Sequence, residues 1–188
     1  MFSDLHANKR ALGDVIPAIE DADLSVFCGD LLGYGKDIDF CVDYVTKHVD
    51  IVVQGDHERM AITDEDLSKQ LAVVRDSAAF TKKNLSLSRK RRLAFLPVEV
   101  WREGLYVTHS LGDDYLRTEK DFERLATKLK KNTRYAFFGH THEQALFDYG
   151  DAVMVNPGSI TKGRRGCPRS YAVIENDVVH FVNLEDIL

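Results

Sequence analysis

One stretch of the chain decides its fold class: residues 24–58, with the sequence LSVFCGDLLGYGKDIDFCVDYVTKHVDIVVQGDHE. It opens with an apolar run, Leu24 to Cys28, and closes with a second one, Ile51 to Val53, and each run is typical of a buried strand. Between them lies a helical pattern from Ile38 to His48, which Asp37 is predicted to cap. A strand–helix–strand order favours parallel pairing through a crossover helix, so we expect an α/β fold.

Upstream of this stretch the sequence predicts a helix and a very short first strand. Asn8 can cap a helix over Lys9 to Glu20, which Pro17 should kink or shorten. Only Met1 to Ser3 precede Asp4, whereas a strand is usually about 5–6 residues long. The first strand of the sheet is therefore expected to be truncated to a stub.

Downstream, a long helical segment is expected from Asp64 to Phe95, with a break near Asn84 to Leu87 where Ser86 or Ser88 can cap the second piece. The pattern then changes to short strands with one more helix, Glu119 to Lys131. The expected strands are Val98 to Trp101, Leu105 to Thr108, Tyr135 to Phe138, Ala145 to Tyr149, Val153 to Asn156, Tyr171 to Ile174 and Val178 to Val182. We expect two facing mixed sheets flanked by helices.

The composition excludes several classes of protein. The 188 residues suit a single domain, residues 1–188, and 25 Lys and Arg against 30 Asp and Glu give a formal net charge of −5. This acidic balance argues against a strong nucleic-acid binder, because that affinity comes largely from phosphate neutralisation. No apolar run approaches the roughly 20 residues that span a bilayer, and no signal peptide is expected. Three cysteines without a Cys-x-x-Cys motif indicate a reducing environment, so a cytoplasmic location is expected.

Five short polar clusters follow apolar strands. They are Asp4-Leu5-His6, Gly29-Asp30, Gly55-Asp56-His57-Glu58, Thr108-His109-Ser110 and Gly139-His140-Thr141-His142. A single cluster of this kind is most often a turn or a surface group. Together they hold five of the seven histidines, and carboxylates with imidazoles at strand ends suit Mn, Fe, Co, Ni or Zn. Their glycines are expected to allow sharp turns that aim the next side chain into one site.

In this order the segments SDLHAN, GDLLGYG, GDHE, THS and GHTH, closed by NPGS at residues 156–159, resemble the calcineurin-like metallophosphoesterase superfamily. Within it the chain is similar to the small single-domain phosphodiesterases and phosphatases of bacteria and archaea. The resemblance implies a four-layer α/β/β/α sandwich with two divalent transition metal ions, Mn first among Mn, Fe, Ni, Co and Zn. It also implies hydrolysis of a phosphodiester or phosphomonoester by a hydroxide that bridges the two metals.

The same resemblance assigns roles to individual residues. The first metal would be bound by Asp4, His6 and His142, the second by Asp56, His109 and His140, and Asp30 would bridge both. His57 would lie beside the substrate phosphate, where it stabilises charge or protonates the leaving oxygen.

The chain departs from the family pattern at two places in the site. Asp56 stands where the family has Asn, and its extra negative charge should reduce turnover while metal binding is retained. Some related phosphatases pair the catalytic histidine with an aspartate at the position that Gly33 holds here, so His57 lacks that partner, and Glu58 is not expected to replace it. The basic residues that follow the NPGS turn, Arg164 and Arg165 among them, suit phosphate recognition or a solvated loop equally well.

Other functions stay open beside the hydrolase, for which a small phosphoester is the expected partner and neither a membrane nor nucleic acid is expected. The family includes a retromer subunit that uses this fold to bind partners, so a non-catalytic metal-binding interaction scaffold is the second hypothesis. Asp56 and the short start favour it, whereas retention of every other ligand argues against it. A nuclease is the third, which the acidic balance disfavours.

Overall fold

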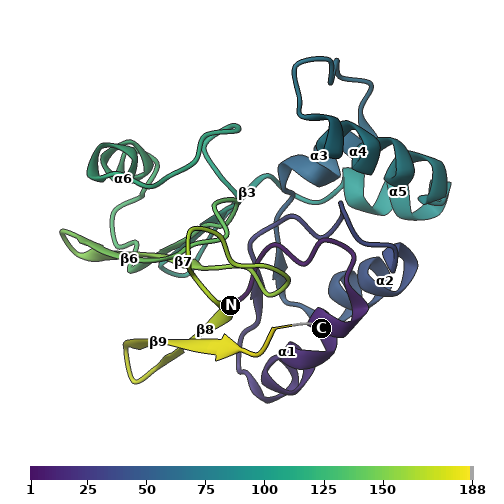
Figure 1. Cartoon of the computed structure of the whole chain (residues 1–188). Helices are drawn as coiled ribbons and strands as arrows, with labels where there is room; N and C mark the ends of the chain where they lie inside the picture. The colour runs from purple at the N-terminus through teal and green to yellow at the C-terminus, as the bar shows by residue number, and fades with distance from the viewer. Residues whose placement is uncertain (187–188) are drawn as a thin grey trace.

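The computed structural model, which describes residues 1–186, has the α/β fold that the sequence predicts (Figure 1). Strands β1 (Val26–Phe27) and β2 (Ile51–Val52) pair in parallel, and helix α2 (Ile38–His48) connects them. This is the crossover expected from residues 24–58, although both strands are shorter than the apolar runs that contain them.

Residues 1–3 join β1 to the hairpin of β8 (Arg169–Glu175) and β9 (Val178–Leu184). On one side they pair with β1 through a single parallel bridge between Phe2 and Phe27. On the other side the Met1 amino group donates to the carbonyl oxygen of Ala172, and the Ala172 amide donates to the carbonyl oxygen of Met1. Residues 1–3 thus connect two pairs of strands.

The second sheet has five strands in the order β3-β4-β5-β7-β6. Its strands are β3 (Glu99–Arg102), β4 (Leu105–Thr108), β5 (Tyr135–Phe137), β6 (Gln144–Tyr149) and β7 (Ala152–Pro157). The central strands β4, β5 and β7 are parallel, and the edge strands β3 and β6 are antiparallel to their neighbours. The sheet is therefore mixed, as predicted.

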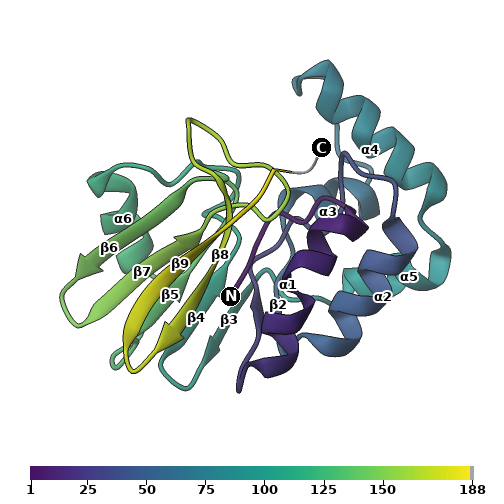
Figure 2. The same ribbon diagram turned by 60° about the horizontal axis from the view of Figure 1, so that its bottom comes forward.

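Three apolar clusters hold the elements together, and Figure 2 shows helices on the outer sides of the sheets. One cluster packs α1 (Lys9–Asp21) and α2 against the first strands, with Leu12 and Val42 among its buried members. The second lies between the sheets and joins Val26 and Ile51 to Val107 and Phe137. The third packs α6 (Glu119–Ala126) on the far side of the second sheet. The loops at the strand ends are thereby fixed to a rigid support.

Helix α1 (Lys9–Asp21) contains Pro17 but continues past it, so the predicted shortening is wrong. Pro17 lies on the exposed face, where the carbonyl that loses its hydrogen bond can be hydrated. The buried face is held by Ala11, Leu12, Val15 and Ile19. Asn8 caps the helix as predicted, since its Oδ1 accepts a hydrogen bond from the Ala11 amide at 3.0 Å.

Asp37 is the N-cap residue of α2, as predicted, but its side chain makes no capping hydrogen bond to the helix. Its Oδ2 instead accepts a hydrogen bond from the backbone amide of Lys9 at 3.0 Å. The carboxylate therefore joins the start of α1 to the start of α2, a contact between segments far apart in the sequence.

The expected helix over residues 64–95 begins later than predicted. Helix α4 (Ala72–Asn84) starts after a loop in which the Ser68 amide donates to Asp66 Oδ1 at 2.9 Å, a local bond that favours a turn. A helix that the sequence did not predict, α3 (Asp56–Ile62), precedes this loop. The predicted break is correct, because α5 (Leu87–Ala94) follows with Ser86 as its cap.

Helix α6 (Glu119–Ala126) ends before the predicted end at Lys131. Beyond Ala126 the turn tightens, and the Lys128 amide donates to the Leu125 carbonyl three residues back, at 3.0 Å. Among residues 1–186 we find no helix with the length and apolar character that crossing a membrane requires.

Candidate metal centre

All seven predicted metal ligands come together at the ends of the strands and fall into two groups. The first group is Asp4, His6, Asp30 and His142, and the second is Asp30, Asp56, His109 and His140. Within each group the ligand atoms lie within 4.8 Å of one another. Asp30 belongs to both groups, because it follows β1 between the loops that carry the others. The structure thus places these residues as the sequence grouped them, and their role as ligands remains a prediction.

Histidines of the first group are held by backbone carbonyls. His6 Nδ1 lies 3.0 Å from the carbonyl oxygen of Leu32, and His142 Nδ1 lies 2.8 Å from that of Lys162. Because a carbonyl oxygen only accepts, each Nδ1 carries a proton and each Nε2 turns into the site. The two Nε2 atoms face each other at 3.0 Å. This is the second-sphere arrangement that orients histidine ligands in metal sites.

In the second group, which also has two carboxylates and two imidazoles, one histidine is held in the same way. His109 Nδ1 lies 2.7 Å from the carbonyl oxygen of Cys28, so Nε2 points inward. That Nε2 lies 3.2 Å from His140 Nδ1, 3.2 Å from Asp56 Oδ1 and 3.3 Å from Asp30 Oδ1. His140 Nδ1 is also 3.0 Å from Asp56 Oδ1. Two imidazole nitrogens and two carboxylates therefore converge on a second point.

These contacts require a cation. Facing imidazole nitrogens repel each other through their lone pairs unless a proton or a metal ion lies between them. Both carboxylate oxygens of fully buried Asp4 accept no hydrogen bond, although His142 Nε2 lies 3.2 Å from Oδ1. A buried carboxylate without such bonds is costly unless a charge compensates it. The nitrogen and oxygen donors fit divalent transition metals.

Burial and neighbouring charges also shift the pKa values of the groups in this centre. Burial raises the pKa of Asp4, but the charges of the neighbouring His142, His109 and His6 together reverse this and hold it well below its usual range. Burial lowers the pKa of His6 to about 4. Burial also lowers the pKa of His109, yet the charge of Asp30 and the hydrogen bonds to Asp30 and Asp56 together outweigh it and raise that pKa well above its usual value. The carboxylates thus keep positive charge in the site, whether it is a proton or a metal ion.

Comparisons with known proteins identify the family. A family model described as "Calcineurin-like phosphoesterase superfamily domain" matches residues 1–178. The chain belongs to this superfamily. The crystal structure of a metallophosphoesterase from Sphaerobacter thermophilus is similar to it with a TM-score of 0.81 and 24% identity, over 99% of this chain and 87% of that one.

The chain is also similar to two further proteins. Phosphodiesterase YfcE of Escherichia coli strain K12 is 37% identical over 49 residues, so the match spans 26% of this chain and about a quarter, 27%, of that relative. Vacuolar Protein Sorting 29 from Cryptosporidium parvum has a TM-score of 0.57 at 13% identity, over 96% of this chain and 93% of that one. At that identity the second likeness concerns the fold alone.

At two positions of the superfamily motifs only glycine fits, because a side-chain atom of another residue lies too close for a Cβ. A Cβ on Gly55 would lie 2.1 Å from Asp30 Oδ1, and one on Gly33 would lie 2.2 Å from His57 Nδ1. Gly33 also has a φ of +92°, which side chains disfavour. Gly55 has an extended backbone, with a φ of −99°, so the expectation of a sharp turn there is wrong. Its hydrogen atom gives Asp30 room to enter the site.

Five of the seven candidate ligands have left-handed backbones. They are Asp4, His6, Asp30, His140 and His142, with φ between 51° and 69°. Such a conformation costs a non-glycine residue on the order of 1 kcal/mol and persists only where the surrounding structure imposes it. The packing of the sheets and their apolar clusters therefore holds these five residues in a backbone conformation that they would otherwise avoid.

Glu58 supports the centre in a way that the sequence did not predict. Its side chain is fully buried and accepts three backbone hydrogen bonds: from Asp30 at 3.0 Å, Leu32 at 2.7 Å and Gly55 at 2.8 Å. Burial, followed by the charge of Asp30, raises its pKa to about 8, and the bonds from Gly55 and Leu32 oppose that rise. Glu58 thus ties the loops after β1 and β2 together. Its place at the third position of α3 was the signal available in the sequence.

His57 lies beside the first group without serving as one of its ligands. Its ring centre is 5.0 Å from that of His6 and 4.7 Å from that of Tyr34, and its backbone amide donates to Asp30 Oδ1 at 3.1 Å. Within the described chain, its ring nitrogens make no hydrogen bond. Glu58 is engaged elsewhere, which confirms that it does not replace the missing carboxylate partner. Sequence reasoning missed Tyr34, an exposed ring at the edge of the site.

A cleft of about 390 Å³ adjoins the second group, and its lining includes Asp56, His109, Arg59 and Lys128. Arg59 is held by Asp113, with Nη1 2.7 Å from Oδ1. The predicted substrate residues lie elsewhere. The Arg164 amide donates to the His142 carbonyl at 3.0 Å, and Arg165 is an exposed side chain 3.9 Å from Glu143. The structure places Arg164 next to the first group, and its contact with substrate stays a prediction.

Proposed function

We propose that this protein is a metal-dependent hydrolase of phosphodiesters or phosphomonoesters that uses two divalent transition metal ions, Mn²⁺ first among them. The observation that carries the proposal is the pair of facing imidazole contacts, 3.0 Å in the first group and 3.2 Å in the second, each next to a buried carboxylate. Membership of the superfamily and the partial match to YfcE support it.

Each side chain then has a task that follows from its place. The first group would hold one ion and the second group the other, and Asp30 would contribute to both because its carboxylate has two oxygens. Bound divalent ions in such a pair polarise the phosphate and lower the pKa of water. The carbonyl bonds at Nδ1 of His6, His109 and His142 keep the ligand nitrogens oriented before substrate arrives.

His57 would act as the general acid. Its ring is buried next to the first group, and both ring nitrogens are free of hydrogen bonds within the described chain, so either can carry the transferred proton. Histidine is the side chain that most often acts as a general acid, and it suits proton donation to a leaving alkoxide. The substrate would be a small phosphoester beside His57, with Arg164 and Arg165 contacting it from the loop after β7.

The experiment is hydrolysis of bis-p-nitrophenyl and mono-p-nitrophenyl phosphate by protein stripped with a chelator and reloaded with Mn²⁺. We expect no turnover without metal, about two Mn²⁺ bound per chain by metal analysis, and turnover restored by Mn²⁺. His57→Ala should keep the metal and lose turnover, whereas His48→Ala, on the outer helix α2, should keep both.

The interaction scaffold remains the second candidate, favoured by the carboxylate at position 56. It predicts bound metal without turnover. If the Mn²⁺-loaded chain and its Asp56→Asn variant both fail to hydrolyse either ester, the hydrolase proposal is wrong.

A further inference from the structure

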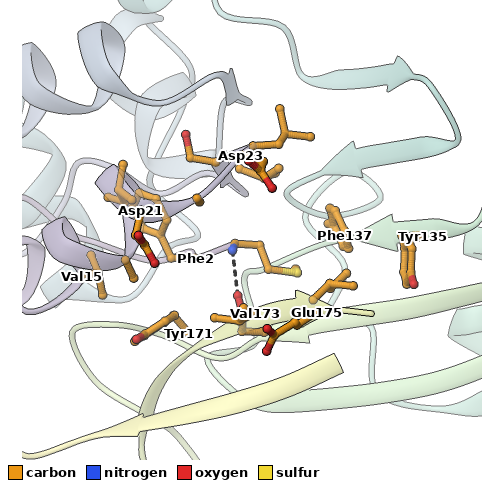
Figure 3. Close-up of a pocket in the computed structure, with 18 of the residues that line it drawn as sticks. Phe2, Val15, Asp21, Asp23, Tyr135, Phe137, Tyr171, Val173 and Glu175 are labelled. Atoms are coloured by element: carbon orange, nitrogen blue, oxygen red, sulfur yellow. Dashed lines mark hydrogen bonds between the residues drawn. The ribbon is translucent and has the colours of Figure 1, made fainter. Parts of the chain in front are cut away.

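Two tyrosine rings lie against candidate metal ligands. Tyr34 meets a histidine of the first group edge-on, whereas Tyr115 stacks on His140, with the ring centres 4.3 Å apart and an angle of 23° between the planes. Figure 3 shows Tyr135 and Tyr171 in the lining of a separate cavity of about 620 Å³ between α1 and β8, and no candidate ligand is among its lining residues. The stack on His140 thus belongs to the metal centre, and this cavity does not.

His140 differs from the other three candidate histidine ligands in how its ring is held. In His6, His109 and His142 the ring nitrogen Nδ1 lies at most 3.0 Å from a backbone carbonyl oxygen. His140 instead turns Nδ1 into the site, 3.0 Å from Asp56 Oδ1. Its Nε2 is buried and has no hydrogen-bond partner in the described part of the chain. A carbonyl oxygen therefore does not set the rotation of this ring.

The Tyr115 ring supplies the missing restraint. Rotation about the Cβ–Cγ bond of a histidine has a broad energy profile, so the ring needs a neighbour that fixes it. An imidazole turned on edge would collide with a phenol ring whose centre lies 4.3 Å away, whereas the stacked arrangement is favourable. The stack keeps Nδ1 directed at Asp56 Oδ1 and at His109 Nε2, 3.2 Å away. It thus does for His140 what a carbonyl oxygen does for the other three histidines.

A cation also lies against the Tyr115 ring. The guanidinium carbon of Arg117 is 4.4 Å from the ring centre, a distance at which the electron-rich face of a tyrosine attracts a positive charge. The guanidinium is bound in turn by Glu143, with Nε 2.8 Å from Oε1. Because Glu143 follows His140 by three residues, this pair joins the loop that carries Tyr115 to the loop that carries His140.

The loop between β4 and α6, which presents Tyr115, is anchored on both sides of the ring. Before it, the Asp114 carbonyl accepts a hydrogen bond from Ser110 Oγ at 2.7 Å, and the Asp114 carboxylate accepts one from Arg124 Nη2 at 2.6 Å. After it, Leu116 is buried in the cluster beneath α6. Tyr115 itself is 45% exposed. Its place against His140 is therefore imposed by its neighbours and not by burial of its own ring.

We propose that Tyr115 is a positioning residue for the second metal ion, on which it acts through His140. This inference rests on the metal centre of the proposed function. The Tyr115 ring sets the rotation of the imidazole and directs the Nδ1 lone pair to the point on which Asp56 and His109 converge. A ligand oriented in advance loses less freedom on binding, so it holds the ion more tightly. The first ion, whose ligands do not include His140, keeps its affinity.

The test is Mn²⁺ binding by the full chain and by its Tyr115→Leu variant, measured by titration calorimetry and by the electron paramagnetic resonance signal of the coupled pair of ions. We expect one of the two ions to bind about 10- to 100-fold more weakly in Tyr115→Leu, the usual loss when the support of a ligand is removed. The other ion should bind as in the parent chain. The signal of the coupled pair should fall at limiting Mn²⁺, and the Tm of the metal-free variant should equal that of the parent.

Three further variants serve as controls. Tyr115→Phe keeps the ring and should bind both ions as the parent chain does. Tyr149→Leu removes a tyrosine of similar exposure, 41%, from the edge strand β6 and should also leave both affinities unchanged. In a His140→Ala background, Tyr115→Leu should weaken Mn²⁺ binding no further, because its effect passes through the imidazole.

Several results would overturn the inference and leave the proposed function intact. Unchanged affinities in Tyr115→Leu would show that the stack does not position His140. Equal weakening of both ions, or a clearly lower Tm of the metal-free variant, would show a general structural role. The same loss in Tyr115→Phe, or a further loss in the His140→Ala background, would show that Tyr115 acts by another route. A parent chain that binds no Mn²⁺ would instead overturn the proposed metal centre and this inference together.

Discussion

Replacing Asp56 by Asn tests how the charge of the centre sets its activity. Asp56 Oδ1 lies 3.2 Å from His109 Nε2 and 3.0 Å from His140 Nδ1, so its charge is within the second group of ligands. An amide has nearly the same shape and keeps an oxygen at that position. The substitution therefore changes the charge by one unit with little change in packing.

The expected magnitude follows from the charges and distances. The three aspartates contribute −3 against +4 from two divalent ions, so the formal charge of the loaded centre is +1, and it becomes +2 in Asp56→Asn. At about 5 Å and an effective dielectric constant of about 20, one unit charge contributes roughly 3 kcal/mol to the attraction of an anionic phosphate. Solvent and relaxation reduce this value, so we expect kcat/KM to rise by about 10- to 100-fold at saturating metal.

The same change should weaken metal binding, because a neutral oxygen replaces an anionic ligand. Plots of rate against Mn²⁺ concentration should therefore cross: Asp56→Asn is slower at low metal and faster at saturation. The assay is hydrolysis of bis-p-nitrophenyl phosphate over a Mn²⁺ titration, with bound metal measured in parallel. Asp151→Asn, an exposed change of the same charge in the turn between β6 and β7, serves as the control and should change neither quantity. A saturating rate for Asp56→Asn that equals or falls below that of the parent chain would refute the charge argument.

Two further substitutions test the supports of the site. Gly33→Ala places a Cβ 2.2 Å from His57 Nδ1 at a φ of +92°, so we expect kcat to fall at least about tenfold while bound metal stays constant, whereas Gly13→Ala, which meets no atom within 4 Å, should leave kcat unchanged. Equal kcat in the two variants would show that the position of His57 does not limit turnover. Glu58→Ala leaves three buried amides without an acceptor, so urea unfolding should show a loss of at least about 3 kcal/mol, against less than about 0.5 kcal/mol for Glu123→Ala on the surface. A loss in Glu58→Ala as small as in the surface control would contradict the bracing role.

Sequence reasoning reached the α/β class, the order of strands along the chain and the polar clusters at the strand ends. These follow from local patterns: apolar runs such as Ile51 to Val53 mark buried strands, and polar residues directly after them mark strand ends. The set of seven candidate ligands was implied by the resemblance to the superfamily. Helix ends were less accurate, because short-range signals do not include competing contacts. Asp37 was predicted as a cap for α2, but the amide of Lys9 takes its carboxylate. Pro17 did not shorten α1, because it lies on the exposed face while the buried face of the helix stays packed.

The sequence by itself determined which residue types gather at the strand ends, because each strand and the residues that follow it can be recognised from a short stretch of neighbouring residues. Only the tertiary structure decided how they act together. It showed that Glu58 joins the loops after β1 and β2, and that Gly55 is needed for its missing Cβ and not for its turn. Each of these is a distance between groups far apart in the chain. Such distances are fixed when the sheets pack, and no pattern of neighbouring residues contains them.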